Sequence, residues 1–259
     1  MIVSTWNVNS IRTRLPRCVA FLERHRPDVL CLQETKVPDG EFPVEAFEAL
    51  GYRATLHGQR TYNGVAILSR APAADPERGL AGGEGDEQAR FLAVTVEGIR
   101  IASVYVPNGE SPDSPKFAYK LDWLERLAAW LREKARPDQP LVVAGDFNVA
   151  PEDRDVHDPA LWRGKVLFHP EEHRRLGSLL EWGLADLLRL RHPEEGIYTW
   201  WDYRMGAFHR GWGLRIDLLL GTDPVARRCA DVLVDREERK PSGGEGKPSD
   251  HAPVLVRLE

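Results

Sequence analysis

The chain has few cysteines, no long apolar run and no excess of positive charge. Its three cysteines, Cys18, Cys31 and Cys229, include no C-x-x-C pair, which argues against a disulfide framework and a zinc-ribbon site. No apolar stretch approaches the roughly 18 residues of a membrane span, and Met1–Trp6 has the pattern of a strand, not of an export signal. We therefore expect reduced thiols and a cytoplasmic protein with no membrane contact.

The bulk charge also limits the possible partners. The formal net charge is −5 and the sequence pI about 6.0, so any contact with nucleic acid must use a local basic face. With 42% hydrophobic and 29% charged residues, the chain has enough apolar material for a sizeable core. Its length of 259 residues fits either two small domains or one large α/β domain.

Short apolar runs alternate with helical patterns along the chain. The expected strands are Ile2–Trp6, Asp28–Leu32, Tyr52–His57, Val65–Ser69, Phe91–Val96, Arg100–Val106, Leu141–Gly145, Arg215–Leu220, Val232–Asp235 and Pro253–Leu258. The expected helices are Leu15–His25, Phe117–Ala135 and Glu171–Trp182, and the expected surface loops are Ala71–Ala89, Ala150–His169 and Arg236–Ser249. This organisation indicates a mixed α/β protein with one large sheet or two.

Polar side chains follow three of the expected strands. Asn7 and Asn9 follow the first strand, Glu34 the second, and Asp146 and Asn148 follow Leu141–Gly145. Residues two apart on an extended chain point to the same side, so each pair is expected to converge on one spot. Each residue alone is also an ordinary turn residue, and Glu34 alone fits a surface ion pair with Lys36. The combination favours a functional site.

An aspartate inside an apolar strand needs a partner. Asp217 lies in such a run, and the best candidate is His251, just before the final strand, because a carboxylate favours a charged imidazole ring. Asp250, the next residue back, offers a further metal ligand. A lone histidine in this position is more often structural, so the pair carries weight only with the other motifs.

Six motifs in one order resemble those of the exonuclease III family of apurinic/apyrimidinic (AP) endonucleases. They are Trp6-Asn7-Val8-Asn9, Leu32-Gln33-Glu34-Thr35-Lys36, Tyr105-Val106-Pro107-Asn108-Gly109, Gly145-Asp146-Phe147-Asn148, Leu214-Arg215-Ile216-Asp217 and Ser249-Asp250-His251. This resemblance implies a four-layer α/β sandwich, two packed mixed β-sheets flanked by helices, as a single catalytic domain over residues 1–259. Some relatives carry Asp in place of Asn9, and a neutral amide is the weaker ligand for a second metal.

By the same resemblance, the chain is a DNA-repair phosphodiesterase that uses Mg²⁺, for which Mn²⁺ can substitute. The expected metal ligands are Glu34, Asn7, Asp250 and Asn9. The expected catalytic residues, which position water, phosphate and leaving oxygen, are Asp146, Asn148, His251, Asp217, Tyr105 and Asn7. The base is either Asp146 or His251, and sequence alone leaves both open.

The resemblance also implies the substrate. Trp200 and Trp212 are expected to wall a pocket for a flipped-out sugar that lacks its base, although core packing is an equal alternative for each. Further expected DNA contacts are Arg204, Tyr62, Asn63 and Lys247. The expected substrate is double-stranded DNA with abasic sites or 3′ ends, cut by AP endonuclease, 3′→5′ exonuclease and 3′-phosphatase or 3′-phosphodiesterase activities of a monomer.

Two other classes of function remain as alternatives. A phosphoesterase of the same fold that acts on lipid headgroups or nucleotides would need a membrane-seeking surface, and the sequence has no amphipathic basic helix. A non-catalytic relative that only binds nucleic acid would be expected to lack the charged site residues, yet Glu34, Asp146, Asp217 and His251 are all present.

Overall fold

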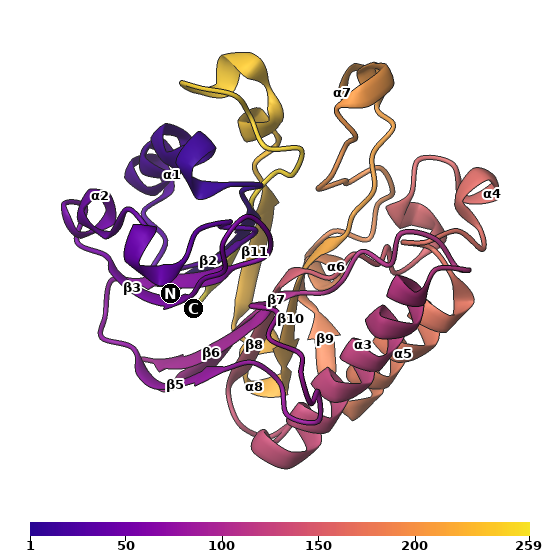
Figure 1. The fold of residues 1–259 in the computed structure, drawn as a ribbon, viewed down its shortest axis with the longest axis horizontal. Helices are drawn as coiled ribbons and strands as arrows, with labels where there is room; N and C mark the ends of the chain where they lie inside the picture. The colour runs from indigo at the N-terminus through magenta and orange to yellow at the C-terminus, as the bar shows by residue number, and fades with distance from the viewer.

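The computed structural model describes all 259 residues and contains two six-stranded sheets that stack face to face (Figure 1). In spatial order, the first sheet contains β11 (Cys229–Val234), β12 (Val254–Leu258), β1 (Ile2–Asn7), β2 (Val29–Gln33), β4 (Val65–Ser69) and β3 (Arg53–His57). The second contains β5 (Ala74–Arg78), β6 (Phe91–Val96), β7 (Ile99–Tyr105), β8 (Leu141–Asp146), β10 (Asp217–Thr222) and β9 (Leu184–Asp186). Each sheet is mixed, because β1 pairs with β2 and β7 with β8 in parallel while the other neighbours are antiparallel.

Helices cover the outer face of each sheet. The first sheet is covered by α1 (Ile11–His25) and α2 (Val44–Glu48), and the second by α3 (Pro115–Lys134) and α5 (Pro170–Trp182) (Figure 1). The short helices are α4 (Pro159–Trp162), α6 (Leu187–Arg191), α7 (Ala207–Arg210) and α8 (Asp223–Ala226). Single 3₁₀ turns span Asp39–Glu41, Asp153–Asp155, Arg204–Gly206, Arg236–Arg239 and Pro241–Gly243.

The apolar residues of the strands explain the layers. In β2, Val29 and Cys31 face the second sheet, whereas Leu30 and Leu32 face α1 and α2. Side chains alternate between the two faces of a strand, so an uninterrupted apolar run fits a strand that is covered on both faces. The expected four-layer α/β sandwich is confirmed. None of the helices combines the length and the apolar character that a membrane crossing requires.

Two of the observed strands were not predicted. β5 lies inside the expected loop Ala71–Ala89, so the expectation of a loop throughout that segment is wrong. This edge strand contains Pro76 and mostly exposed charged residues, features that keep a sheet edge from pairing with other chains and that erase the alternating apolar pattern. β9 is only three residues long and is too short for a periodic signal.

Helices also differ from the prediction in detail. α1 begins at Ile11, not Leu15, so Pro16 lies in its second turn and removes one backbone donor there instead of standing at a helix start. The expected loop Ala150–His169 contains the short helix α4, and the expected loop Arg236–Ser249 contains two single 3₁₀ turns. Such one-turn elements are too short to show a helical repeat of apolar residues.

The sheet topology brings the carboxyl ends of several strands to one edge. The parallel pair β1 and β2 ends at Asn7 and Gln33, with Glu34 directly after β2, and the parallel pair β7 and β8 ends at Tyr105 and Asp146. β10 is antiparallel to β8, and its first residue, Asp217, pairs directly with Asp146. Polar groups from both sheets therefore meet at this edge of the sandwich.

Candidate active site

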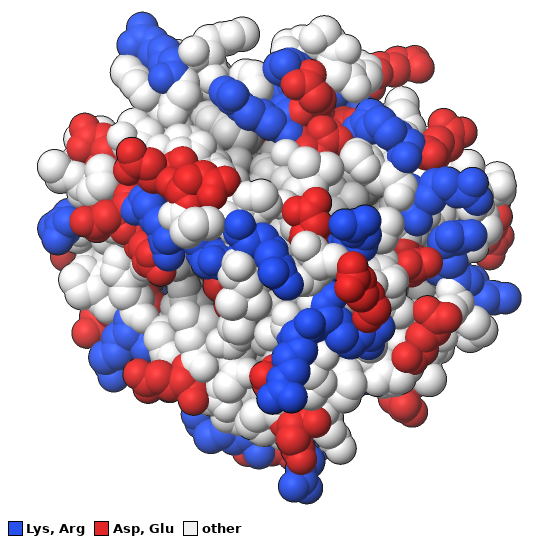
Figure 2. Space-filling view, turned by 180° about the vertical axis from the view of Figure 1, so that it is seen from behind, with Lys and Arg blue, Asp and Glu red and all other residues white.

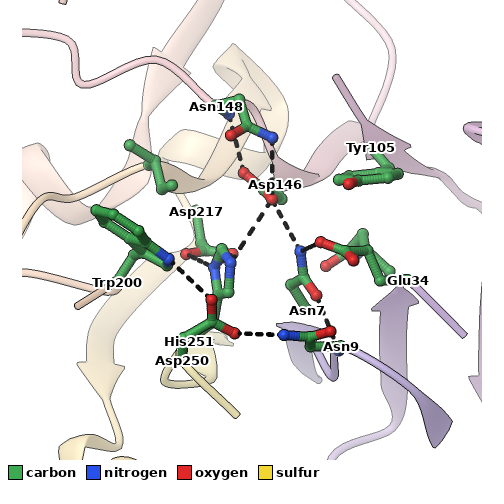
Figure 3. A network of polar contacts seen from close by, with 12 residues as sticks. Asn7, Asn9, Glu34, Tyr105, Asp146, Asn148, Trp200, Asp217, Asp250 and His251 are labelled. Atoms are coloured by element: carbon green, nitrogen blue, oxygen red, sulfur yellow. Dashed lines mark hydrogen bonds and ion pairs between the residues drawn. The ribbon is translucent and has the colours of Figure 1, made fainter. Parts of the chain in front are cut away.

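Four buried polar residues from the two sheets form the base of the candidate site, and we name them the site floor (Figure 3). They are Asn7, Asp146, Asp217 and His251, each no more than 4% exposed. The Asn7 amide donates one hydrogen bond to Glu34 Oε1 at 2.8 Å and a second to Asp146 Oδ2 at 2.9 Å. Asn7 thereby links a carboxylate of the first sheet to a carboxylate of the second.

The loop after β8 fixes the carboxylate of Asp146. The backbone N–H of Asn148 donates to Asp146 Oδ1 at 2.9 Å, and the Asn148 side-chain amide donates to Asp146 Oδ2 at 3.1 Å. Asn148 has a left-handed backbone with φ of 49°, which asparagine tolerates better than most residues. Gly145 is required just before Asp146, because a Cβ there would lie 1.9 Å from the carbonyl oxygen of Val104.

The predicted contact between Asp217 and His251 is confirmed. His251 Nδ1 lies 2.9 Å from Asp217 Oδ2, and its Nε2 lies 3.8 Å from Asp146 Oδ2. The hydroxyl of Thr199 accepts the backbone N–H of Asp217, which fixes the start of β10. A carboxylate on Nδ1 leaves the other ring nitrogen pointing to Asp146 and the open side of the site.

Burial and neighbouring charges move the pKa values of the floor. Burial opposes the charged form of His251, but the carboxylates of Asp217 and Asp146 outweigh it and raise the pKa of His251 to about 10. Burial, together with the charges of Asp217 and Glu34, raises the pKa of Asp146 to about 7, although His251 and Asn7 oppose this shift. At neutral pH, the ring is therefore a cation beside a carboxyl group that is close to its midpoint.

A second polar cluster adjoins the floor and contains Asp250. One carboxylate oxygen of Asp250 accepts the Asn9 amide at 3.0 Å, and the other accepts the indole N–H of Trp200 at 3.1 Å. Burial would raise the pKa of Asp250, but the charge of His251 and these two hydrogen bonds lower it overall. Lys36 joins this cluster to Glu34, because its Nζ lies 2.5 Å from Asn9 Oδ1 and 2.9 Å from Glu34 Oε2.

The donor atoms fit a hard divalent cation. Ligand atoms of Glu34, Asp146 and His251 all lie within 4.8 Å of one another, with the Asn7 amide between the two carboxylates. Carboxylate and amide oxygens are the groups that Mg²⁺ and Ca²⁺ prefer, whereas zinc sites use Cys and His. The structure thus places Glu34 with Asn7 as expected, but it places Asp146 closer to Glu34 than the expected ligand Asp250, which pairs with Asn9.

We name Trp200, Tyr203 and Trp212 the aromatic rim. They lie on the segment of residues 198–213, which contains α7 (Figure 1), and Trp200 adjoins the site through its hydrogen bond to Asp250. Trp200 is partly buried against Leu214 and Ile216, and Trp212 is 36% exposed between the ring of His157 and the guanidinium of Arg210. Trp201, the neighbour of Trp200 in the sequence, is 1% exposed and belongs to the core.

A hollow of the surface is lined by Glu34 and Tyr105. It is a cleft of about 820 Å³ whose walls include Tyr62 and Asn63, two of the predicted substrate contacts. Arg204 does not line this cleft; its side chain is 85% exposed and pairs with Asp202. Lys247 lines a separate hollow of about 280 Å³ and lies over the ring of Tyr203. The six expected DNA contacts therefore lie on different parts of the surface, and only some adjoin the floor.

Sequence reasoning did not single out several side chains that hold the site. Asn108 donates to Asn148 Oδ1 at 3.1 Å, and Ser249 donates to the carbonyl oxygen of Asn7 at 2.7 Å. Lys36 was considered only as a surface partner of Glu34. All three lie inside the motifs quoted above, one to three residues from a predicted site residue, so position within a motif was the available signal.

Comparisons with known proteins agree with this geometry. The sequence profile of the Endonuclease/Exonuclease/phosphatase family matches residues 4–251. Exodeoxyribonuclease III of Haemophilus influenzae is 34% identical over 267 aligned residues, which cover 98% of each chain. Among solved structures, the 3′ phosphatase NExo from Neisseria, bound to a product DNA hairpin, is 43% identical with a TM-score of 0.96, covering 100% of this chain and 99% of that one. An AP endonuclease from Archaeoglobus fulgidus is 41% identical with a TM-score of 0.95 over 100% and 99% of the two chains.

Proposed function

The chain belongs to the endonuclease/exonuclease/phosphatase family, and we propose that it is a DNA-repair hydrolase that cuts phosphodiester bonds at abasic sites and at 3′ ends. The observation that carries this proposal is the contact of Asp146, Asp217 and His251 beside Glu34, in a chain similar over its whole length to an exodeoxyribonuclease and an AP endonuclease. This hydrolase combines AP endonuclease with 3′→5′ exonuclease activity, and we infer 3′-phosphatase activity at the same site.

The pKa values support distinct roles for the two candidate bases. Asp146, with a pKa of about 7, accepts a proton from the attacking water near neutral pH. His251 already carries its proton up to a pKa of about 10, so it acts as a cation that donates to a phosphate oxygen. Asn148 orients Asp146, and Asp217 orients His251. We therefore assign the base to Asp146, the choice that the sequence left open.

Tyr105 supplies a donor on the other side of Asp146. Burial and the nearby carboxylate of Glu34 raise the pKa of Tyr105 well above its ordinary value. The phenol therefore keeps its proton under all working conditions and is able to donate it in a hydrogen bond to the phosphate or the leaving 3′ oxygen.

We infer that the metal is Mg²⁺, with Mn²⁺ as a substitute, held by Glu34 and Asn7 and assisted by Asp250 and Asn9. To be a ligand, Asn7 would turn toward Glu34 the amide oxygen that here accepts the backbone N–H of Asn9, in place of the NH₂ group that donates to Glu34. When bound, the cation neutralises charge on the phosphate and stabilises the departing oxygen. Its charge also offsets the repulsion between Glu34 and Asp146, whose ligand atoms lie within 4.8 Å. Family membership supports metal dependence, and the oxygen-rich donor set supports a hard cation.

The substrate we propose is double-stranded DNA, bound by a monomer in the cytoplasm. Three buried, unpaired cysteines agree with a reducing compartment. Lys and Arg side chains alternate with Asp and Glu over the face seen in Figure 2, so that face offers no continuous positive surface. We infer that DNA instead binds over the cleft lined by Tyr62 and Asn63 and against Trp200, which adjoins Asp250.

The test is a nicking assay on duplex DNA that contains one abasic site, with a parallel duplex that ends in a 3′-phosphate. We expect cleavage of both substrates with Mg²⁺, complete loss of both in EDTA, and recovery when Mg²⁺ or Mn²⁺ is added in excess. Full activity in EDTA would contradict the metal-assisted reaction. Cleavage of neither DNA, together with hydrolysis of a lipid headgroup or a free nucleotide, would contradict the DNA substrate.

A further inference from the structure

A fully buried lysine lies on the core-facing side of α3. Lys120 is 0% exposed and occupies the same stripe as the buried residues Phe117, Leu124 and Leu127. Residues three and four apart share one face of a helix, so the apolar pattern would place another apolar side chain at position 120. An ammonium group in a core is unfavourable unless its charge and all its donors find partners.

The partners of Lys120 account for every donor of its ammonium group. Lys120 Nζ donates to the backbone carbonyl of Asn148 at 2.5 Å, to that of Asn108 at 3.1 Å, and to the carboxylate of Glu172. An ammonium group has three hydrogens, so three acceptors satisfy it completely. Two of the three are backbone carbonyls of the loops that follow β7 and β8, and no other side chain of the structure bridges this pair of carbonyls.

Glu172 fixes the lysine from the other side. It is also 0% exposed and lies in the first turn of α5. Its carboxylate accepts the backbone N–H of Leu167 at 3.1 Å and that of His169 at 2.9 Å, in addition to the lysine. The pair of Lys120 and Glu172 therefore joins α3 and α5 to the loops that carry Asn108 and Asn148.

From Lys120, the contacts lead directly to Asp146. Asn148 has a left-handed backbone, and Lys120 holds its carbonyl oxygen in that conformation. The same residue donates both its backbone and its side-chain N–H to the Asp146 carboxylate, and Asn108 in turn donates to Asn148 Oδ1. Lys120 itself touches neither Asp146 nor any open surface of the site.

We propose that Lys120, held by Glu172, is a positioning residue for the hydrolytic reaction, and that it acts through Asn148 on the orientation of Asp146. The inference rests on the proposed function, because it concerns the same site. Turnover depends on sub-ångström placement of the group that takes the proton of the attacking water. A fixed Asn148 carbonyl prevents the loop after β8 from rotating, and so keeps both Asp146 oxygens in place.

A purely structural role is the competing explanation, and it makes a different prediction. Replacing both members of a buried ion pair with neutral groups is often neutral for stability, whereas removing one member leaves an unpaired buried charge. If the pair serves only stability, the doubly neutral protein regains turnover together with stability. If the pair positions Asn148, stability returns and turnover does not.

The experiment compares Lys120→Met, Glu172→Gln and the double variant, with kcat, KM and Tm measured on the abasic-site duplex below the Tm of each protein. We expect kcat of the double variant to fall about 10–100-fold, as for other residues that orient a site group, while KM changes little. Its Tm is expected to exceed that of Lys120→Met. The matched control is Arg126→Met, which removes a buried cation of the same helix that pairs with Asp86 and Asp122, and its kcat is expected to stay near wild type.

A second set of variants tests the route through Asn148. We compare Asn148→Ala alone with Asn148→Ala combined with Lys120→Met/Glu172→Gln. The combined variant is expected to have a kcat less than about threefold below that of Asn148→Ala alone, because both changes disturb the same chain of contacts to Asp146. The proposal would be overturned if Asn148→Ala and the double variant reduced kcat by independent factors that multiply in the combined protein. Near-wild-type kcat in the double variant would also overturn it. Failure of the double variant to fold would also overturn it, because the pair would then be a requirement of folding. Inactive wild-type protein would instead contradict the proposed function.

Discussion

The site floor lies on strands of both sheets and the segments that adjoin them, whereas the aromatic rim lies on a single loop between residues 198 and 213. The floor side chains are almost fully buried, and each has at least one polar partner within the site. In the rim, Tyr203 is 39% and Trp212 is 36% exposed, and only Trp200 donates a hydrogen bond to a site residue, Asp250. The sheets thus fix the groups that we propose hydrolyse the bond, and a loop carries the groups that we propose contact the substrate.

This difference matters for what a substitution changes. A group held by the packed sheets acts on every phosphodiester that reaches the site, because its position does not depend on the substrate. A side chain on the loop contacts only those substrates that extend to it. Floor substitutions are therefore expected to reduce all activities together, and rim substitutions to change the ratio between them.

The largest expected effect is on the floor. Asp146→Asn and His251→Ala are each expected to lower kcat about 10²–10⁴-fold, the range for a lost general acid or base, with a much smaller change in DNA binding. Steady-state rates on the abasic-site and 3′-phosphate duplexes, with Kd from an uncleavable duplex, measure both quantities. Glu34→Gln is the companion variant, and it should instead raise the Mg²⁺ concentration needed for half-maximal rate.

Stability provides the control for these variants. The carboxylate of Asp146 is disfavoured by burial and by neighbouring negative charges, so the neutral Asn at this position is not expected to lower Tm. An Asp146→Asn protein with unchanged Tm and near-normal turnover would show that another group is the base.

The next effect concerns Trp200, where the floor and the rim meet. Trp200→Ala is expected to cost on the order of 1–3 kcal/mol in kcat/KM for the abasic-site duplex, the scale of one pocket contact. Cleavage of the 3′-phosphate duplex should fall much less. Trp200→Phe keeps the aromatic wall but removes the N–H that Asp250 accepts, so any loss in this variant is expected to be similar for both substrates.

Melting temperature decides between a pocket wall and a core residue. A cavity left by a fully buried Trp costs about 3–5 kcal/mol of folding free energy and reduces all activities together. Because Trp200 is only partly buried, we expect a smaller drop in Tm for Trp200→Ala. A large drop in Tm, with equal loss of both activities, would show that Trp200 is a core-packing residue and not a pocket wall.

The pH dependence of the activity is expected to be set by the ionisable groups of the floor and not by the rim. Activity needs Asp146 ionised, so it should rise through a pKa of about 7, and it needs His251 protonated, so it should fall through a pKa of about 10. The pH profile thus has an acid limb below the lower pKa and an alkaline limb above the higher pKa, and on each limb kcat should change about tenfold per pH unit. A bound divalent cation stabilises the carboxylate, which moves the acid limb to lower pH.

Asp217→Asn tests the assignment of the two limbs. The negative charge of Asp217 raises the pKa of both Asp146 and His251, so the neutral amide should move both limbs to lower pH. The measurement is the pH profile of kcat/KM for wild type, Asp217→Asn and Trp212→Ala, which shows whether floor or rim residues set the two limbs. If the rim variant moved the limbs and the floor variant did not, the assignment would be wrong.

The sequence predicted the floor better than its surroundings because strand-end residues follow simple geometry. Asn7, Glu34 and Asp146 meet because parallel neighbours end at one edge, and Asp217 needed a partner because it lies in an apolar strand. The four-layer fold followed from the resemblance, since apolar runs alone left the number of sheets open. The edge strand β5 was missed because its charged residues and proline hide the strand pattern.

Other features of the site depend on tertiary contacts that no local pattern contains. Glu34 and Asn148 have left-handed backbones, with φ of 52° and 49°, which turn their side chains in directions that a regular strand would not give. The hydrogen bond of Trp200 to Asp250 spans 50 residues, and the contact of Lys120 with Asn148 spans 28. The sequence analysis predicted Glu34, Asn148, Trp200 and Asp250 as site residues but not these contacts between them, and it did not single out Lys120.

The smallest expected effect belongs to Trp212, the most detached member of the site. Its ring stacks on His157 and lies under Arg210, and it makes no contact with the floor. Trp212→Ala is therefore expected to raise KM for the abasic-site duplex about fivefold, equivalent to the roughly 1 kcal/mol of one aromatic stacking contact, while kcat and Tm stay close to wild type. Leu190→Ala, a substitution of an exposed apolar residue on α6, is the matched control and should leave KM unchanged. A fall in kcat with unchanged KM would instead link Trp212 to the chemistry of the floor, and would remove the distinction between floor and rim.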